Sequence, residues 1–103
     1  MVVLVNCFKV ASGREDEFFA LWREVNSYMR SKTGFLSHRL HRSIDPGAPY
    51  RFINVAHWHS LTDFNNAHDD GFRTLVGDSR WKEFPSTPTV CEVFHEANTA
   101  AAD

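Results

Sequence analysis

The sequence predicts an α+β domain in which helices cover one face of an antiparallel sheet. Segments with strand alternation and segments with helical spacing follow one another in the order strand, helix, strand, strand, helix, strand. This is the order of the ferredoxin-like βαββαβ fold. With 103 residues, of which 43% are hydrophobic, the chain is long enough for one core. We expect a single domain over residues 1–97 and a flexible, alanine-rich tail over residues 98–103.

The first half of the chain predicts a strand followed by a helix. Val2–Val10 is rich in valine and alternates as a strand does. Ser12 and Glu15 have the spacing of a capping box, which satisfies free backbone N–H groups where a helix begins. Apolar residues at helical spacing follow, and we expect the helix to end near Lys32, with Gly34 as its stop.

The middle of the chain predicts a hairpin. Phe35–Ser43 alternates as a second strand, with Leu36, His38 and Leu40 on one face. Residues 45–49 contain two prolines and a glycine and predict a turn into a third strand, Tyr50–His59.

The last part of the chain predicts short helices and a final strand. Ser60 is placed to cap a helix that runs through Ala67. A break at residues 69–71 precedes a further helix at Phe72–Val76, and residues 78–84 hold one more turn with Trp81. Residues 85–88 are expected as a loop and Thr89–Glu96 as the last strand.

The first and third predicted strands are apolar on both faces. A sheet with helices on one side only carries polar residues on its bare face. The face that bears Val3, Val5, Ile53 and Val55 therefore needs a cover that so few helices cannot supply. We expect a second copy of the chain to supply it, which makes the protein a homodimer.

Composition and motifs argue against several classes of partner and cofactor. The net charge is −2 and no basic stripe occurs, so we expect neither nucleic acid nor a membrane as partner. No glycine-rich phosphate loop follows a strand, so nucleotide cofactors lack their usual anchor. The six histidines form no set of three with metal-ligand spacing, so we expect no metal and no cofactor. Cys7 and Cys91 are expected as buried free thiols in a reducing cytoplasm.

Asn6, Asn54 and Trp58 are the strongest candidates for chemistry. Asparagine is depleted in strand interiors, and a buried amide without a partner costs about 1–3 kcal/mol. Alternation places Asn54 and Trp58 on one face, and Asn6 joins them if the first and third strands are neighbours. Such groups in an apolar cavity could orient a phenol or quinone carbonyl and stabilise an oxyanion. The alternative is that the amides bond to the backbone and Trp58 fills the core.

The chain resembles the antibiotic biosynthesis monooxygenase (ABM) family. Four of its segments and the first predicted helix follow one another in the order typical of that family. The segments are Val5–Phe8, Thr33–His38, Asp45–Tyr50 and Asn54–Trp58, and the resemblance covers residues 2–96. It implies a ferredoxin-like fold whose sheets associate in pairs as a dimeric α/β barrel.

The resemblance also implies an activity. Quinone-forming members oxidise anthrone-like aromatic polyketides with molecular oxygen and neither metal nor flavin, using Asn on the first strand and Asn and Trp on the third. Asn6, Asn54 and Trp58 match these residues and are the predicted catalytic groups. The predicted substrate-binding residues are Phe8, Trp22, His38, Phe52, Phe64, His68, Phe72 and Arg80. The chain departs from one member in having Phe64 where a tyrosine stands, and Arg80 is the nearest basic candidate.

Other functions stay open on the sequence. The haem-degrading branch shares the first-strand Asn but places a Trp on the second helix and a haem-ligating His about one short helix later. Here those positions hold Ala67 and a stretch near Val76, so His68 could bind haem only in a shifted register. An isomerase, a cyclase or a non-catalytic dimer whose rings fill the pocket are the further alternatives. The volume of empty space beside Asn6 and Trp58 in a structure distinguishes an open substrate pocket from one filled by the rings.

Overall fold

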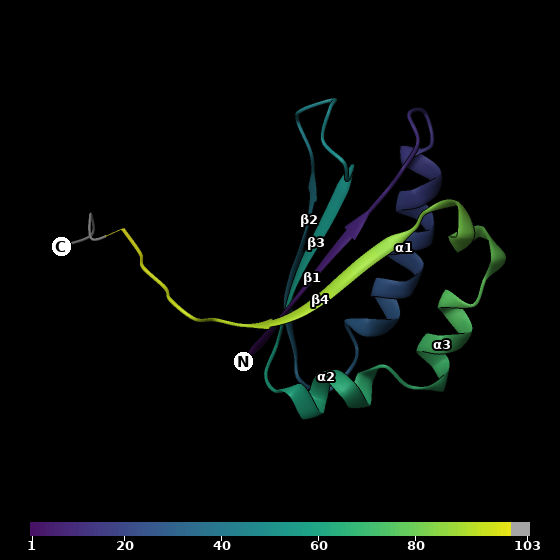
Figure 1. Cartoon of the computed structure of the whole chain (residues 1–103). Coiled ribbons are helices and arrows are strands. Elements are labelled where there is room, and N and C mark those ends of the chain that lie inside the picture. The colour runs from purple at the N-terminus through teal and green to yellow at the C-terminus, as the bar shows by residue number, and fades with distance from the viewer. Residues whose placement is uncertain (100–103) are drawn as a thin grey trace.

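The computed structural model describes residues 1–99, and its helices and strands follow the predicted order (Figure 1). The four strands form one antiparallel sheet in the order β2-β3-β1-β4, with the bounds β1 Val2–Phe8, β2 Phe35–Arg42, β3 Phe52–Trp58 and β4 Ser86–Glu92. The helices lie together on one face of this sheet, with the bounds α1 Glu15–Met29, α2 Leu61–Ala67, α3 Asp70–Val76 and the 3-10 helix η1 Ser79–Glu83. The predicted ferredoxin-like α+β fold is confirmed. None of the helices in residues 1–99 has the length and apolar character needed to cross a membrane.

The two central strands, β1 and β3, place their alternate residues as the sequence predicts. Phe52, Asn54, Ala56 and Trp58 are buried under the helices, whereas Ile53, Val55 and His57 between them are half-buried on the other face. Asn6 pairs directly with Asn54 across the two strands. The two amides therefore emerge side by side from the middle of the sheet.

Helix α1 buries one stripe against the sheet because its apolar residues recur at three- and four-residue spacing. The predicted capping box at Ser12 is wrong: the helix begins at Glu15, after an Arg14 N-cap whose side chain makes no capping bond. Gly13 has a φ of 87° and turns the chain outside the helix, and Glu15 Oε1 accepts a hydrogen bond from the Gly13 backbone N–H at 2.8 Å. The helix ends at Met29 rather than near Lys32.

Strand β2 contains an irregularity that changes which residues face the helices. The pairing with β3 shifts between Phe35 and Ser37, as at a β-bulge. Leu36 is therefore 52% exposed instead of joining His38 and Leu40, and Phe35 packs edge-on against Trp58 at 5.4 Å. The prediction that Leu36 shares a face with His38 and Leu40 is wrong for this reason.

Strand β4 begins three residues earlier than predicted and ends at Glu92 rather than Glu96. Residues 85–88 are therefore not a loop: Ser86, Thr87 and Pro88 pair with β1. Proline is tolerated there because β4 is an edge strand, which does not need every N–H for pairing. Beyond Glu92 the chain runs away from the sheet (Figure 1). The expected flexible tail at residues 98–103 lies outside the described residues from residue 100 onward.

One end of the layer between sheet and helices is packed with aromatic rings, and we call it the filled end. Its members are Phe8, Phe18, Leu21, Phe52 and Phe84, all buried. Phe18 is fully buried, stacks on Phe52 at a centroid distance of 4.7 Å and meets Phe8 at 4.9 Å. This end anchors α1 to the central strands and leaves the other end of the layer free to differ.

Candidate functional site

A cavity of about 570 Å³ lies between the helices and the central strands, next to the filled end. This volume falls within the range of about 300–1,000 Å³ that is usual for small-molecule sites. Its lining includes Asn6 and Trp58, so the space beside these residues is open rather than filled by rings. The cavity is therefore large enough for an aromatic ligand.

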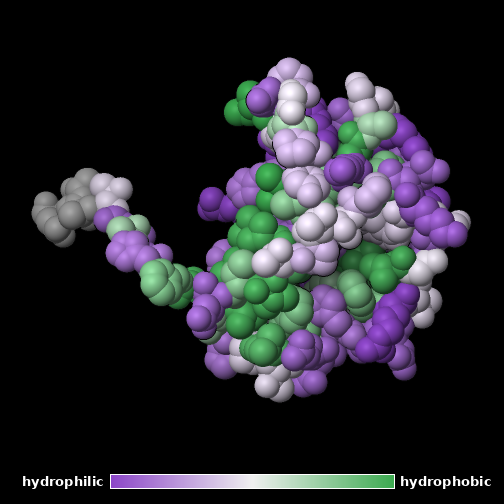
Figure 2. All heavy atoms as spheres, viewed as in Figure 1, coloured by the Kyte–Doolittle hydropathy of each residue, from purple (hydrophilic) through white to green (hydrophobic). Residues whose placement is uncertain are grey.

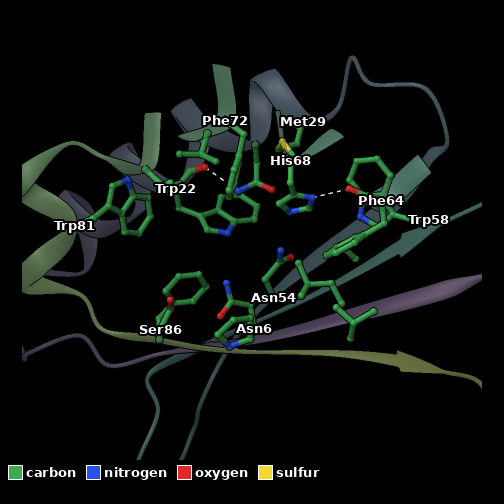
Figure 3. Close-up of a pocket in the computed structure, with 18 of the residues that line it drawn as sticks. Asn6, Trp22, Met29, Asn54, Trp58, Phe64, His68, Phe72, Trp81 and Ser86 are labelled. Carbon is green, nitrogen blue, oxygen red and sulfur yellow. Dashed lines mark hydrogen bonds between the residues drawn. The ribbon is translucent and has the colours of Figure 1, made fainter. Parts of the chain in front are cut away.

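Two asparagine amides form the polar part of the sheet side of the cavity. Asn54 is only 4% exposed, and Figure 3 shows the amides of Asn6 and Asn54 side by side, turned toward the helices. The Oδ1 atom of each is buried and has no hydrogen-bond partner within the described chain. Leaving such groups unpaired costs about 1–3 kcal/mol each. A bound molecule with O–H groups that donate to these oxygens would recover that free energy.

Three indole N–H groups add donors around the same space. Trp58 ends β3 and is 2% exposed, Trp22 projects from α1, and Trp81 comes from η1. The Nε1 atom of each is buried and finds no acceptor among residues 1–99. An indole N–H can only donate. Together with the amide N–H groups of Asn6 and Asn54, these donors suit a ligand that carries carbonyl or phenolate oxygens.

His68 closes the helix side of the cavity. It is the C-cap residue of α2, and its Nδ1 lies 2.6 Å from the Phe64 carbonyl oxygen. Its ring is held between Phe64 and Phe72, with centroid distances of 4.2 and 4.5 Å. Figure 3 shows the second ring nitrogen of His68 on the cavity side, facing Asn54.

Asp69 ties the link between α2 and α3 to the end of α1. Its Oδ1 accepts a hydrogen bond from the Phe72 backbone N–H at 3.0 Å and from the Tyr28 hydroxyl at 2.8 Å. Its Oδ2 accepts one from Lys32 Nζ at 2.6 Å. The Lys32 bond, followed by the Phe72 N–H bond, lowers the pKa of Asp69 well below its usual range. This carboxylate therefore fixes the neighbouring His68 and the ring of Phe72 above the cavity.

Eight of the predicted site residues line the cavity: Asn6, Phe8, Trp22, Asn54, Trp58, Phe64, His68 and Phe72. Three predicted substrate-binding residues do not. Phe52 belongs to the filled end. His38 lies behind Trp22 at a ring distance of 5.0 Å, where burial, followed by repulsion from Arg30, lowers its pKa. Arg80 points away and binds Asp78, with Nη2 and Oδ2 at 2.6 Å.

Several residues that line the cavity were not predicted from the sequence. Asn26 lies one turn after Trp22 on the buried stripe of α1 and donates from Nδ2 to the Trp22 carbonyl at 2.9 Å. Its helical spacing from Trp22 was the signal available for finding it. Ser86 and Pro88 were missed because β4 was expected to start at Thr89. Within residues 1–99, no group of three His, Cys, Asp or Glu side chains is placed to hold a metal ion.

The family model described as antibiotic biosynthesis monooxygenase matches residues 1–71 of this chain. The chain belongs to the ABM family. Among solved structures, a candidate monooxygenase from Shewanella loihica PV-4 shares 34% identity with it, at a TM-score of 0.79 over 92% of this chain and 95% of the other. No match to a curated protein was found.

Two further solved structures are similar to this chain at lower identity. SnoaB, a cofactor-independent oxygenase from Streptomyces nogalater, is 24% identical, with a TM-score of 0.73 over 96% of this chain and 95% of SnoaB. A single-site mutant of MhuD, crystallised with two manganese protoporphyrin IX molecules per active site, is 21% identical, with a TM-score of 0.73 over 96% of this chain and 100% of MhuD. At these identities the two structures support the fold of this ABM protein.

Proposed function

We propose that this ABM protein is a monooxygenase that needs no cofactor and oxidises an electron-rich phenol or anthrone to a quinone with molecular oxygen. The observation that carries the proposal is the cavity itself, in which aromatic walls enclose the unpartnered polar groups of Asn6, Asn54 and Trp58. Family membership and the likeness to SnoaB, which is described as a cofactor-independent oxygenase, support the same activity.

The reaction balances without an external reductant. The substrate methylene loses a proton, and the resulting anion passes an electron to oxygen. The two radicals then combine into a carbon–oxygen bond, which gives a hydroperoxide after protonation. Loss of water from the hydroperoxide leaves the new carbonyl, so one CH₂ and one O₂ become one C=O and one H₂O. The substrate carbon supplies the four electrons that oxygen takes up.

The protein contributes binding and charge stabilisation. Amide N–H groups of Asn6 and Asn54 and the indole N–H of Trp58 are donors for the substrate oxygen on which negative charge develops. The remaining lining is almost entirely apolar and keeps water from the anion. These groups are fixed in strands before the substrate binds, so they need little reorganisation during the reaction.

Haem is the competing ligand, because Nε2 of His68 faces the cavity and imidazole is a common iron ligand. The other lining residues do not fit haem. No lysine or arginine is among the cavity-lining residues of the described chain, so the two haem propionates would have no cationic partner there. For this reason we favour a neutral or phenolic aromatic substrate.

We further propose that the protein is a homodimer joined through the helix-free face of the sheet. Val3, Val5, Ile53 and Val55 are half-buried on that face, and no helix of residues 1–99 covers them. Figure 2 shows apolar side chains gathered where the chain leaves β4. Just beyond β4, Val93 is 46% exposed and Phe94 is 98% exposed. Large exposed apolar areas of this kind mark interfaces.

Light scattering tests the dimer. At micromolar concentration the wild type should have the mass of two chains, and Val55→Asp should give a monomer or an unfolded protein, because it places a charge in the interface. Asp16→Asn changes a charge on the exposed side of α1 and serves as the control. A wild-type monomer would contradict the proposal.

A turnover assay tests the oxygenase activity. Chelator-treated, colourless protein is incubated with a hydroxyanthrone under air and under nitrogen, and quinone absorbance and oxygen uptake are recorded together. We expect one O₂ consumed for each quinone formed under air and no quinone under nitrogen. Arg73→Ala, which removes an exposed guanidinium on α3, should behave as wild type. Turnover that appears only after haem, flavin or metal is added would refute cofactor independence.

A further inference from the structure

His68 is the one titratable side chain among the cavity-lining residues of the described chain. The other lining residues are aromatic or aliphatic side chains, proline, methionine, one serine and three asparagines. None of these accepts a proton near neutral pH. A substrate that must lose a proton inside the cavity therefore meets one protein group that can take it.

The structure also fixes which nitrogen of His68 is available. A carbonyl oxygen only accepts hydrogen bonds, so the 2.6 Å contact with the Phe64 carbonyl requires the proton to be on Nδ1. In the neutral ring, Nε2 then carries the lone pair. Because Phe64 and Phe72 hold the ring at 4.2 and 4.5 Å, it cannot easily rotate to exchange the two nitrogens.

The lone pair of Nε2 faces the two amides across the cavity. Figure 3 shows His68 on the helix side and Asn54 and Asn6 on the sheet side, with open space between them. A flat aromatic ligand in that space would present its ring carbon to one side and its oxygen to the other. The base and the anion-stabilising donors therefore lie on opposite sides of one molecule, which suits abstraction of a proton from the ring carbon while charge develops on the oxygen.

We propose that His68 is the catalytic base of the oxygenation. Nε2 takes a proton from the substrate methylene, and the resulting imidazolium keeps its Nδ1–H bond to the Phe64 carbonyl. After oxygen has added, the imidazolium returns the proton to the distal oxygen of the peroxide. The second methylene proton leaves with that oxygen as water, and His68 is neutral again. This inference rests on the proposed function, and it adds the residue that starts the reaction.

Hydrogen exchange without oxygen tests this step separately. Under nitrogen in D₂O, the wild type should accelerate deuterium uptake at the anthrone methylene, followed by NMR, because exchange needs the base but not oxygen. His68→Gln should lose about 10²–10⁴-fold of that acceleration, which is the usual contribution of a general base. His59→Gln is the matched control, because the His59 side chain is 76% exposed and does not line the cavity.

A second variant distinguishes lost chemistry from lost folding. His68→Ala leaves space for a free imidazole, and added imidazole should restore part of the exchange if Nε2 is the base. Wild-type exchange in a folded His68→Gln protein would overturn the proposal, and so would a wild type that gives no exchange. A wild type that exchanges deuterium but consumes no oxygen in air would leave the base assigned and refute the oxygenase activity instead.

Discussion

The two ends of the layer between sheet and helices use the same kinds of residue to opposite effect. At the filled end, Phe18 is fully buried and stacks on Phe52 at 4.7 Å, and the buried members of the cluster are all hydrophobic. At the other end, rings of similar size surround a cavity of about 570 Å³ that is also lined by three asparagines and a histidine. Aromatic content alone therefore does not decide whether a layer is core or pocket.

The difference lies in the polar groups that the strands introduce. Asn6 and Asn54 lie at paired positions of β1 and β3, among apolar residues of the same strands. Tight packing around them would leave their amides without water or hydrogen-bond partners. Such burial costs free energy at each amide. An open volume lets these groups bind water or a ligand, so the asparagines and the cavity belong together.

Removing one ring from each end should produce the largest effect and the sharpest contrast. Phe18→Ala should lower the free energy of unfolding by about 3–5 kcal/mol, because a dense cluster of rings loses its centre. Phe64→Ala should cost clearly less, because one side of Phe64 already borders the cavity. Denaturant unfolding of both variants measures the two values. Equal losses would show that the two ends are packed alike.

Removing the polar groups should affect turnover and spare stability. Asn54→Ala should lower the turnover rate by two to three decades, equivalent to about 2.7–4 kcal/mol in the barrier. Its melting temperature should hold or rise, because the amide oxygen it removes is buried and unpaired. Trp58→Phe keeps a ring and removes the indole N–H, and it should behave similarly. Lower melting temperatures with unchanged turnover in both variants would assign these residues to the core.

Asp69 offers a smaller test, confined to the cavity end. Asp69→Asn should lower the melting temperature and weaken substrate binding, because the Lys32 ion pair that fixes the α2–α3 link is lost. The folded-state pKa of Asp69 lies below 3.8, so the folded protein binds fewer protons at this site than the unfolded chain. The stabilisation from Asp69 is therefore complete above pH 3.8 and is lost as the pH falls through the lowered pKa of the folded state.

Asp70→Asn is the matched control for that measurement. Asp70 also forms an ion pair, in this case with Arg73, but the Asp70 side chain is fully exposed. Exposed ion pairs of this kind contribute little to the free energy of unfolding. A change in melting temperature as large as that of Asp69→Asn would show that charge alone, rather than the link to α1, explains the result.

His38 should give the smallest effect, a change in the pH dependence of stability. Its pKa in the folded protein lies below 6.5, because the ring is partly buried behind Trp22 and repelled by Arg30. As the pH falls, the unfolded chain takes up the proton first, so this site destabilises the fold on acidification. His38→Leu should therefore reduce the loss of melting temperature between about pH 7.5 and 5.5. An unchanged pH profile would contradict this assignment.

Regular alternation made the centre of the fold predictable, whereas the local backbone irregularities could not be predicted from the sequence. The faces of β1 and β3, the paired asparagines and the Ser60 cap, whose hydroxyl accepts from the Asp63 N–H at 3.0 Å, all follow from residue spacing. The bulge at Phe35 and the early start of β4 depend on pairing with strands distant in sequence. Spacing along one segment cannot report such pairing.

The cavity lining was predictable where it comes from the sheet and less so where it comes from the helices. Period-two alternation identified Asn54 and Trp58, but which residues of α2, α3 and η1 reach the cavity depends on how short helices are tilted. Arg80 was expected near the substrate as the nearest candidate for the basic residue that the resemblance to the ABM family implies. A local ion pair with Asp78 directs its guanidinium to solvent instead.

All three tryptophans of the chain, Trp22, Trp58 and Trp81, line the cavity. The intrinsic fluorescence of the protein therefore arises almost entirely from the site where the substrate is proposed to bind. A polycyclic aromatic ligand that absorbs in the emission range of tryptophan should quench it by energy transfer in proportion to occupancy. Occupancy could then be followed without a label and under nitrogen, when no turnover accompanies it.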